Sequence, residues 1–414
     1  MGRNIGLRAM FLAVLIHLYG LALAFDARAQ ARATDIDALQ TAFERADRGD
    51  WDEARDAVSA ASPLAAKLVE WRYYSSSPPG EPFDRIERFL KASPKWPGRP
   101  LLLASAENAL WRDGLSPAAV QFWFAGRTPQ SAAGVLALAE AQRALGQADE
   151  ATETIRVAWR TGRLDVASYR RWASNSGTSL SAGDHAARLD ALLWARNHSA
   201  AEAMESYLSG PEKATMRARI RLQTGARDAE RAYRAVTGAH AASAGLLFDR
   251  AAWLRKRGRS QEAAGILLRA SRALTAFAPS VPVWWQERNI AVRKSLDDGN
   301  AEQAYLLASD HKIAPAKDLT SYVDAEFLAG WIALRRLNRA EAARAHFANI
   351  TNVARAPVSV SRGHYWLGRA YAAINNKTRS QQAFDAAAKF SLTYYGHLAL
   401  TALRPNARVS IPVR

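Results

Sequence analysis

A turn residue, a short polar segment and then alanine recur along the chain, between longer stretches in which small and aliphatic side chains dominate. Clear copies stand at residues 49–54 (GDWDEA), 146–151 (GQADEA), 258–263 (GRSQEA) and 338–342 (NRAEA). Looser copies begin at Gly114, Gly183, Gly225, Gly299 and Asn376. From 114 to 376, successive copies lie 32 to 42 residues apart, near the period of helix-turn-helix repeats. The pattern predicts a degenerate array of helical hairpins.

The physical reason for the pattern is local. Glycine or asparagine accepts the left-handed backbone conformation that ends one helix, and the acidic residue that follows favours the positive N-terminal end of the next helix. Alanine then lets two helices approach closely. Because one hairpin cannot bury its apolar face alone, neighbours stack and the array curves into a superhelix with an inner and an outer surface.

Composition agrees with a helical fold. The chain has 414 residues, long for one compact core, so two or three domains or a solenoid that grows by repetition is expected. Alanine, arginine and leucine dominate, and such side chains lose little rotamer freedom in helices. We find no convincing strand. The predicted fold class is therefore all-α, an α-superhelix (solenoid) of tetratricopeptide-like (TPR-like) hairpins.

Four segments rich in Pro, Gly or Ser interrupt this pattern and predict loops between helices. They are residues 75–82, 93–100, 174–183 and 278–282. The Pro-rich region 75–100 as a whole is, alternatively, a flexible linker between domains.

The two ends differ from the rest. Residues 1–29 carry Arg3 and Arg8, an apolar run from Ala9 to Phe25, and a small-x-small ending at Ala29, which predicts a cleaved secretory signal peptide. A membrane anchor is the alternative, although the run is short for a spanning helix. Residues 30–403 form the predicted scaffold. Residues 404–414 lose helical periodicity and predict a tail or the start of a severed connection.

Charge and cysteine content narrow the class of partner. The formal net charge is +17, and +15 remains after removal of residues 1–29, with three arginines and one aspartate. An exported basic protein is expected to meet a carboxylate-bearing polymer or an anionic membrane surface rather than nucleic acid. The alternative is arginine spread over solvated helix faces with no single patch. The absence of cysteine means that helix packing alone stabilises the fold.

The 13 tryptophans have two interpretations. Each can wedge between hairpins and fill the gap left by small residues. Alternatively, some line a groove and stack on sugar rings, and for that role the candidates are Trp123, Trp284 and Trp285. Packing is the favoured interpretation for the five that sit mid-helix beside alanine: Trp159, Trp194, Trp253, Trp331 and Trp366.

Five segments near the C-terminus carry a resemblance to a known family. They read WWQERNIA (284–291), YVDAEF (322–327), AGWIAL (329–334), YWLGRA (365–370) and YYGHLA (394–399). Together they resemble the helical-ring region of soluble lytic murein transglycosylases, clearest over residues 280–403. The resemblance implies a ring-like or horseshoe-shaped array of hairpins. In complete members this array embraces a lysozyme-like domain that cleaves peptidoglycan glycan strands without water.

The charged residues within those segments also leave two interpretations open. Glu287, Arg288, Asp324 and Glu326 either form buried ion pairs that hold helices together or contact glycan or a catalytic domain directly. The favoured interpretation is the structural one.

The chemistry that the resemblance implies is not evident in the sequence. The family is understood to use one glutamate, in a Glu-Ser motif followed by Gly-Leu-Met-Gln. Here the one Glu-Ser pair is Glu205-Ser206, with no such stretch after it, and we interpret Glu205 as a surface helix residue. No catalytic residue is predicted.

The sequence contains no motif for other kinds of catalytic or cofactor chemistry either. Eight histidines lie at positions 17, 185, 198, 240, 311, 346, 364 and 397. None forms a metal-binding spacing, and no phosphate loop or nucleophile elbow is present, so neither a metal nor a cofactor is predicted.

The leading hypothesis is an exported, periplasmic helical scaffold, equivalent to the non-catalytic part of a soluble lytic transglycosylase and derived from a truncated or split gene or a fragment. It would bind peptidoglycan or a catalytic transglycosylase domain and would be inactive alone. No nucleic acid and no stable membrane insertion after signal cleavage are expected. The alternatives are a periplasmic TPR-like adaptor for proteins and an intact enzyme with an unrecognised active site.

Overall fold

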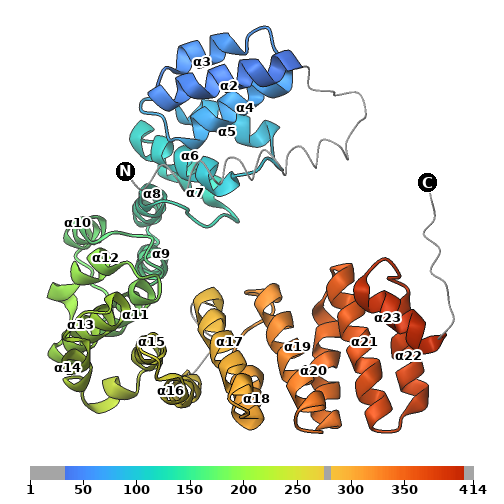
Figure 1. Ribbon diagram of the computed structural model, residues 1–414. Helices are drawn as coiled ribbons and strands as arrows, with labels where there is room; N and C mark the ends of the chain where they lie inside the picture. Colours follow the sequence, from blue (N-terminus) through green and yellow to red (C-terminus); the bar gives the residue numbers. More distant parts are fainter. Residues whose placement is uncertain (1–32, 275–280, 405–414) are drawn as a thin grey trace. The chain divides into compact units, whose positions relative to one another are not determined.

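The computed structural model describes residues 33–274 and 281–404 (Figure 1). The described residues are helical and contain no strand, so the all-α prediction is confirmed. The predicted signal peptide lies outside the described residues, as does the predicted tail apart from Arg404. Among the described helices, none is both long enough and apolar enough to cross a membrane.

The chain forms two compact units, Met1–Asp184 and His185–Arg414, within the range predicted as one scaffold. The described helices of the first unit are α2 (Ala33–Arg48), α3 (Trp51–Ala57), α4 (Pro63–Ser75), α5 (Phe83–Ala92), α6 (Arg99–Asp113), α7 (Pro117–Phe124), α8 (Ala132–Ala144), α9 (Ala148–Arg160) and α10 (Val166–Ser176). The boundary falls inside α11 (Ala182–Trp194).

The second unit continues with short and then longer helices. They are α12 (His198–Glu202), η1 (Glu205–Tyr207), α13 (Gly210–Thr224), α14 (Ala229–Arg234), η2 (Gly238–Ala242), α15 (Ala244–Arg255), α16 (Ser260–Ala273), α17 (Val281–Asp297), α18 (Ala301–Ser309), α19 (Leu319–Arg335), α20 (Ala340–Val353), α21 (Pro357–Ala373), α22 (Lys377–Ala388) and α23 (Tyr394–Leu403).

Within each unit, most helices pack on the next helix in sequence, and several also pack on the one after it. In the second unit, for example, α19 contacts α17, α18, α20 and α21. Connections of three or four residues join α8 to α9, α15 to α16 and α21 to α22. Such short connections make neighbouring helices antiparallel hairpins.

Left-handed residues end helices at most of the predicted turns. Positive φ angles occur at Gly49, Gly114, Gly146, Gly225, Gly258, Gly299 and Asn338. The prediction was wrong at Gly183, which lies inside α11. It was displaced by one residue at Asn376: the left-handed residue is Asn375 (φ 61°), and the Asn376 side chain caps α22 by accepting from the backbone N–H of Arg379.

Three of the four predicted breaks contain loops that are shorter than predicted, and the fourth was wrong where it is described, because residues 281 and 282 belong to α17. Residues 76–82 separate α4 from α5, residues 93–98 separate α5 from α6, and residues 177–181 separate α10 from α11. The region 75–100 is not a flexible linker, because it contains α5, whose Phe83, Ile86 and Leu90 are buried. Hydroxyl and carboxylate side chains begin several helices: Ser62, Ser116, Ser131, Asp165 and Asp318 each accept a hydrogen bond from a backbone N–H of the first turn.

Close approach of helices in the second unit occurs at small residues. The alanines at positions 251, 304, 325, 329 and 343 are fully buried. At Gly330 of α19, an added Cβ would lie 2.7 Å from the ring of Phe347 on α20. At Gly368 of α21, it would lie 2.8 Å from the ring of Phe384 on α22. An aromatic ring therefore occupies the space that a methyl group would need.

This packing predicts opposite effects of the same substitution at two helical glycines. Gly330→Ala should lower the free energy of unfolding by about 1–3 kcal/mol, because the Phe347 ring must move. Gly265→Ala is the matched control, since no atom lies within 4 Å of the added Cβ, and it should raise that free energy by about 0.5–1 kcal/mol. Thermal and urea unfolding of both variants would measure this, and equal effects would contradict the proposed close packing.

Candidate functional site

The three tryptophans predicted as sugar contacts are all buried. Trp284 is fully buried, and its Nε1 donates to the carbonyl oxygen of His311 at 2.7 Å. Trp285 Nε1 donates to Asp324 Oδ2 at 2.9 Å. Trp123 packs edge-on against Phe83 and Phe124. With their rings covered by neighbouring helices, none offers a face to a glycan, which leaves the packing interpretation for all three.

Glu287 forms an ion pair between two helices. The guanidinium of Arg255 on α15 donates to both carboxylate oxygens of Glu287 on α17, from Nε to Oε1 at 2.5 Å and from Nη2 to Oε2 at 3.0 Å. Glu287 is buried and Arg255 is partly exposed. This bidentate geometry fixes α15 against α17, and it occupies both carboxylate oxygens of Glu287, so neither is available to bind a ligand.

Arg288 is buried without a carboxylate in hydrogen-bonding distance. Its Nε and Nη2 donate to the carbonyl oxygen of Leu307 at 3.0 and 2.7 Å, and its Nη1 donates to that of Leu267 at 3.2 Å. Burial lowers the pKa of Arg288 to about 10, partly opposed by the charge of Asp310. Arg288 therefore joins α16, α17 and α18 from inside the second unit.

Glu326 lies at the centre of a buried polar cluster. Its Oε1 lies 3.2 Å from His311 Nε2, and its Oε2 lies 2.6 Å from His346 Nδ1. His311 Nδ1 accepts from the backbone N–H of Ile313, so the proton of a neutral His311 ring is on Nε2, toward Glu326. His346 Nε2 lies 3.2 Å from the hydroxyl of Tyr305. The cluster joins α18, α19 and α20 through one carboxylate.

The electrostatics of this cluster keep Glu326 ionised. Burial alone would raise the pKa of Glu326, but the hydrogen bonds and charges of His311 and His346 outweigh it and lower this pKa to about 2. The neighbouring Tyr322 has its pKa raised to about 12 by burial and by the Glu326 charge. No group of three potential metal ligands with suitable geometry occurs among the described residues, so the cluster is a hydrogen-bond network.

Asp324 and Glu205 also have ordinary partners. Asp324 Oδ2 accepts from Trp285 and from Asn289 Nδ2, both at 2.9 Å. Glu205 begins the short helix η1 at the surface and pairs with Arg217 at 2.7 Å. As the sequence indicated, Glu205 is a surface residue in a helix.

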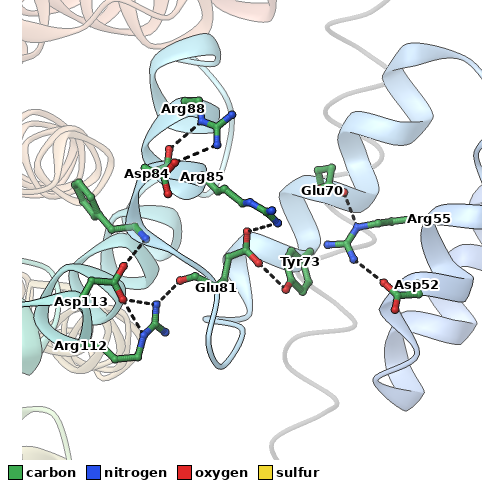
Figure 2. Close-up of polar contacts among 11 residues, drawn as sticks. Asp52, Arg55, Glu70, Tyr73, Glu81, Asp84, Arg85, Arg88, Arg112 and Asp113 are labelled. Atoms are coloured by element: carbon green, nitrogen blue, oxygen red, sulfur yellow. Dashed lines mark hydrogen bonds and ion pairs between the residues drawn. The ribbon is translucent and has the colours of Figure 1, made fainter.

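A second buried carboxylate lies in the first unit. Figure 2 shows Glu81, in the loop before α5, between Tyr73 of α4 and Arg85 of α5. The Tyr73 hydroxyl donates to Glu81 Oε2 at 3.0 Å, and Arg85 Nη1 lies 3.7 Å from Oε1. Burial raises the pKa of Tyr73, and its hydrogen bond to Glu81 raises it further, while Arg55 acts in the opposite direction. Tyr73 therefore stays protonated and holds the loop.

Figure 2 also shows polar contacts that join the same loop to α6. Arg112 of α6 donates to the backbone oxygen of Glu81 and, through Nε, to Asp113 Oδ1 at 3.0 Å. Asp113 Oδ2 accepts from the backbone N–H of Phe83 at 2.8 Å. On the far side of Tyr73, Arg55 donates to Glu70 at 2.8 Å. These contacts hold α3, α4, α5 and α6 together.

A hollow of about 420 Å³ lies between α6, α7 and α8 of the first unit. It is lined by Leu110, Trp111, Gly114, Leu115, Pro117, Val120, Ala137, Glu140, Ala141 and Ala144. Trp111 is half-buried and Glu140 is exposed. The guanidinium of Arg171 lies 5.8 Å from the centre of the Trp111 ring. An apolar wall with one indole and one carboxylate is the composition of a small-ligand site.

Glu140 is available for a ligand. Among the described residues it has no hydrogen-bond or ion-pair partner; partial burial raises its pKa, while the charges of Arg171 and Arg143 act in the opposite direction. The carboxylate shares the lining of the hollow with Trp111 and can accept from hydroxyl or amide groups.

Sequence reasoning missed Trp111. The tryptophans predicted to contact sugars were Trp123, Trp284 and Trp285, and all three pack between helices. A signal existed in Gly114, whose left-handed φ of 62° ends α6 three residues after Trp111. The burial of each tryptophan, however, depends on helices distant in sequence.

No known protein family matches the sequence, and no curated protein matches it. Interpretation of the hollow and of the buried clusters therefore depends on their geometry.

The Glu326 cluster predicts a stability difference that depends on pH. A carboxylate whose pKa falls from 4.5 to about 2 on folding contributes stability above pH 4.5 and loses it as pH falls toward 2. Glu326→Gln should therefore lower the free energy of unfolding by roughly 3 kcal/mol at pH 6, and this difference should shrink as the pH approaches 3.

Urea unfolding of both proteins at several pH values measures this difference. Glu341→Gln is the control, because Glu341 is exposed and its one ion pair within the described residues is with Arg344, three residues along the same helix. It should change stability by less than about 0.5 kcal/mol at every pH. A Glu326→Gln effect that stays constant between pH 6 and pH 3 would contradict the depressed pKa.

Proposed function

We propose that this chain is an exported, non-catalytic scaffold that binds peptidoglycan, equivalent to the helical part of a soluble lytic murein transglycosylase. Residues in the segments that resemble this family support the proposal, because they connect successive helices: Trp284, Trp285, Glu287, Arg288 and Glu326 all contact neighbouring helices. A catalytic transglycosylase domain is the second partner that such a scaffold would position.

The proposed architecture is a TPR-like superhelix. Polar contacts between residues about one repeat apart support it: Trp285 meets Asp324, 39 residues on, Arg255 meets Glu287, 32 residues on, and Arg219 meets Asp249, 30 residues on. Contacts restricted to nearby repeats are the defining property of solenoid proteins.

The observation that carries glycan binding is the hollow beside Trp111. The C–H face of a sugar ring packs well on an indole, and hydroxyl groups pair with a nearby carboxylate such as that of Glu140. The guanidinium of Arg171 adds donors for the hydroxyl and acetamido oxygens of the sugars. The site would hold one or two sugars of a glycan strand at its apolar wall.

A periplasmic adaptor for proteins is the second candidate. Large apolar side chains exposed to solvent favour it: 84% of Phe122, 77% of Leu392, 71% of Tyr394 and 61% of Val358 are accessible. The hydroxyl of Thr393 lies 2.8 Å from that of Ser361, which brings Leu392 and Tyr394 to the first turns of α21, where Val358 also lies. Apolar surface of this kind is common where proteins associate.

Binding to purified peptidoglycan sacculi tests the glycan proposal. The chain should sediment with sacculi, and Trp111→Ala should weaken sedimentation about tenfold, the loss expected for a central aromatic anchor. Trp111→Phe should retain most of the binding because it keeps a ring. The control is Trp96→Ala, which removes another half-buried tryptophan of the same unit. No sedimentation at either low or high salt would favour the adaptor.

Assay for cleavage tests the non-catalytic part of the proposal. The purified chain incubated with sacculi should release no anhydromuropeptides above the buffer control, measured by chromatography and mass spectrometry. Glu205 is exposed and pairs with Arg217, so we do not expect it to act as a general acid. Release that disappears in Glu205→Gln would contradict the proposal and identify an intact enzyme.

A further inference from the structure

A second hollow, of about 520 Å³, lies in the second unit where the chain turns from α13 into α14. Every residue that lines it is charged: Arg227, Asp228, Glu230, Arg231 and Arg234. The side chains of Arg231 and Arg234 are 86% and 76% exposed. The hollow is therefore shallow and open to solvent, and each of its lining side chains ends in a charged group.

The charges around this hollow do not balance. Asp228 lies 3.6 Å from both Arg221 and Arg231, so two guanidinium groups share this carboxylate. Glu230 is likewise shared, by Arg234 at 3.0 Å and by the buried Arg250.

Arg227 has no hydrogen-bond or ion-pair partner among the described residues. Three arginines and two carboxylates therefore line the hollow, and Arg221 and the buried Arg250, which pair with those carboxylates, raise the surplus of positive charge from one to three. Nearby Arg259 and Glu262 pair with each other and do not change this balance. A concave surface with surplus positive charge concentrates anions.

We propose that this hollow binds a peptide that carries carboxylate groups. Guanidinium groups bind carboxylates through two parallel hydrogen bonds, and the exposed Arg227, Arg231 and Arg234 can each turn toward a ligand. The lining carboxylates of Asp228 and Glu230 accept from the amide or ammonium groups of the same peptide. Inorganic phosphate near neutral pH has at most two O–H donors and no amide or ammonium group, so it pairs less completely with both acids than a peptide does.

This inference rests on the proposed function, because the acidic stem peptides of peptidoglycan are then the source of such a ligand. It assigns the two chemical parts of that polymer to different units: the sugar to the hollow beside Trp111 and the peptide to the arginine-lined hollow.

A titration with a synthetic acidic peptide tests the proposal. The probe is Ala-Glu-Ala-Glu, titrated into the full chain by isothermal calorimetry, with inorganic phosphate and anionic phosphatidylglycerol vesicles as separate arms. The double variant Arg227→Glu with Arg231→Glu should weaken peptide binding about tenfold or more, because two donors become repulsive. Arg227→Ala alone should weaken it measurably without disturbing any described contact.

The matched control is Arg335→Glu with Arg336→Glu, which makes the same change in net charge at two exposed arginines of α19 and the residue after it. Equal loss in both double variants would overturn the proposal, since binding would then follow overall charge. Failure of the peptide to bind the unaltered chain would overturn it too. Phosphate or vesicles that bind as tightly, and are lost in the same variant, would overturn the assignment to a peptide.

The result is separable from sedimentation with sacculi. Suppose that the chain does not sediment with sacculi but the peptide still binds, also to Trp111→Ala. This result would support the peptide site at the arginine-lined hollow and reject glycan binding. If sedimentation depends on Trp111 but the peptide does not bind, the result would reject only the peptide site at the arginine-lined hollow.

Discussion

The close approach of neighbouring helices at small side chains is the constraint on which the second unit depends. Gly330 lies against Phe347, Gly368 lies against Phe384, and fully buried alanines line the same interfaces. Small residues on one helix create space, and an aromatic ring from the next helix fills it. Because the gain from close packing is lost if either partner changes volume, each interface specifies the helix that it accepts.

Buried polar groups add specificity to this packing. Arg288 donates only to backbone carbonyl oxygens, Glu326 is shared by two histidines, and Arg219 pairs with Asp249 in the interior of the second unit. Such groups lose hydration on folding, so their net contribution to stability is small even though removal of one partner is harmful. Their effect is to reject other arrangements of similar alanine-rich helices. In a chain without cysteine, no covalent bond performs that selection.

Local features of the fold were predictable, and features set by distant partners were not. Gly146, Gly258 and Asn338 end helices as predicted, since a left-handed turn is a property of the residue itself. Gly183 was assigned wrongly, because glycine also occurs inside helices. The burial of Trp284 could not be read from its neighbours in sequence, since His311 accepts its hydrogen bond 27 residues later. The exposed Glu205 was identified correctly from its polar context.

The same distinction explains why the candidate sites were missed. Segments rich in tryptophans and charges stand out in the sequence because many packing contacts constrain them. In this protein, neighbouring helices cover the side chains of those segments. Binding needs side chains that packing leaves available. Trp111 keeps part of its ring uncovered, and Arg227 has no partner in the described part of the chain. Both lie next to turns between helices, where the small residues needed for close packing give way to larger and more polar ones. Ligand sites in this protein are therefore to be sought at the turns between helices, and the conspicuous motifs explain how the helices are held.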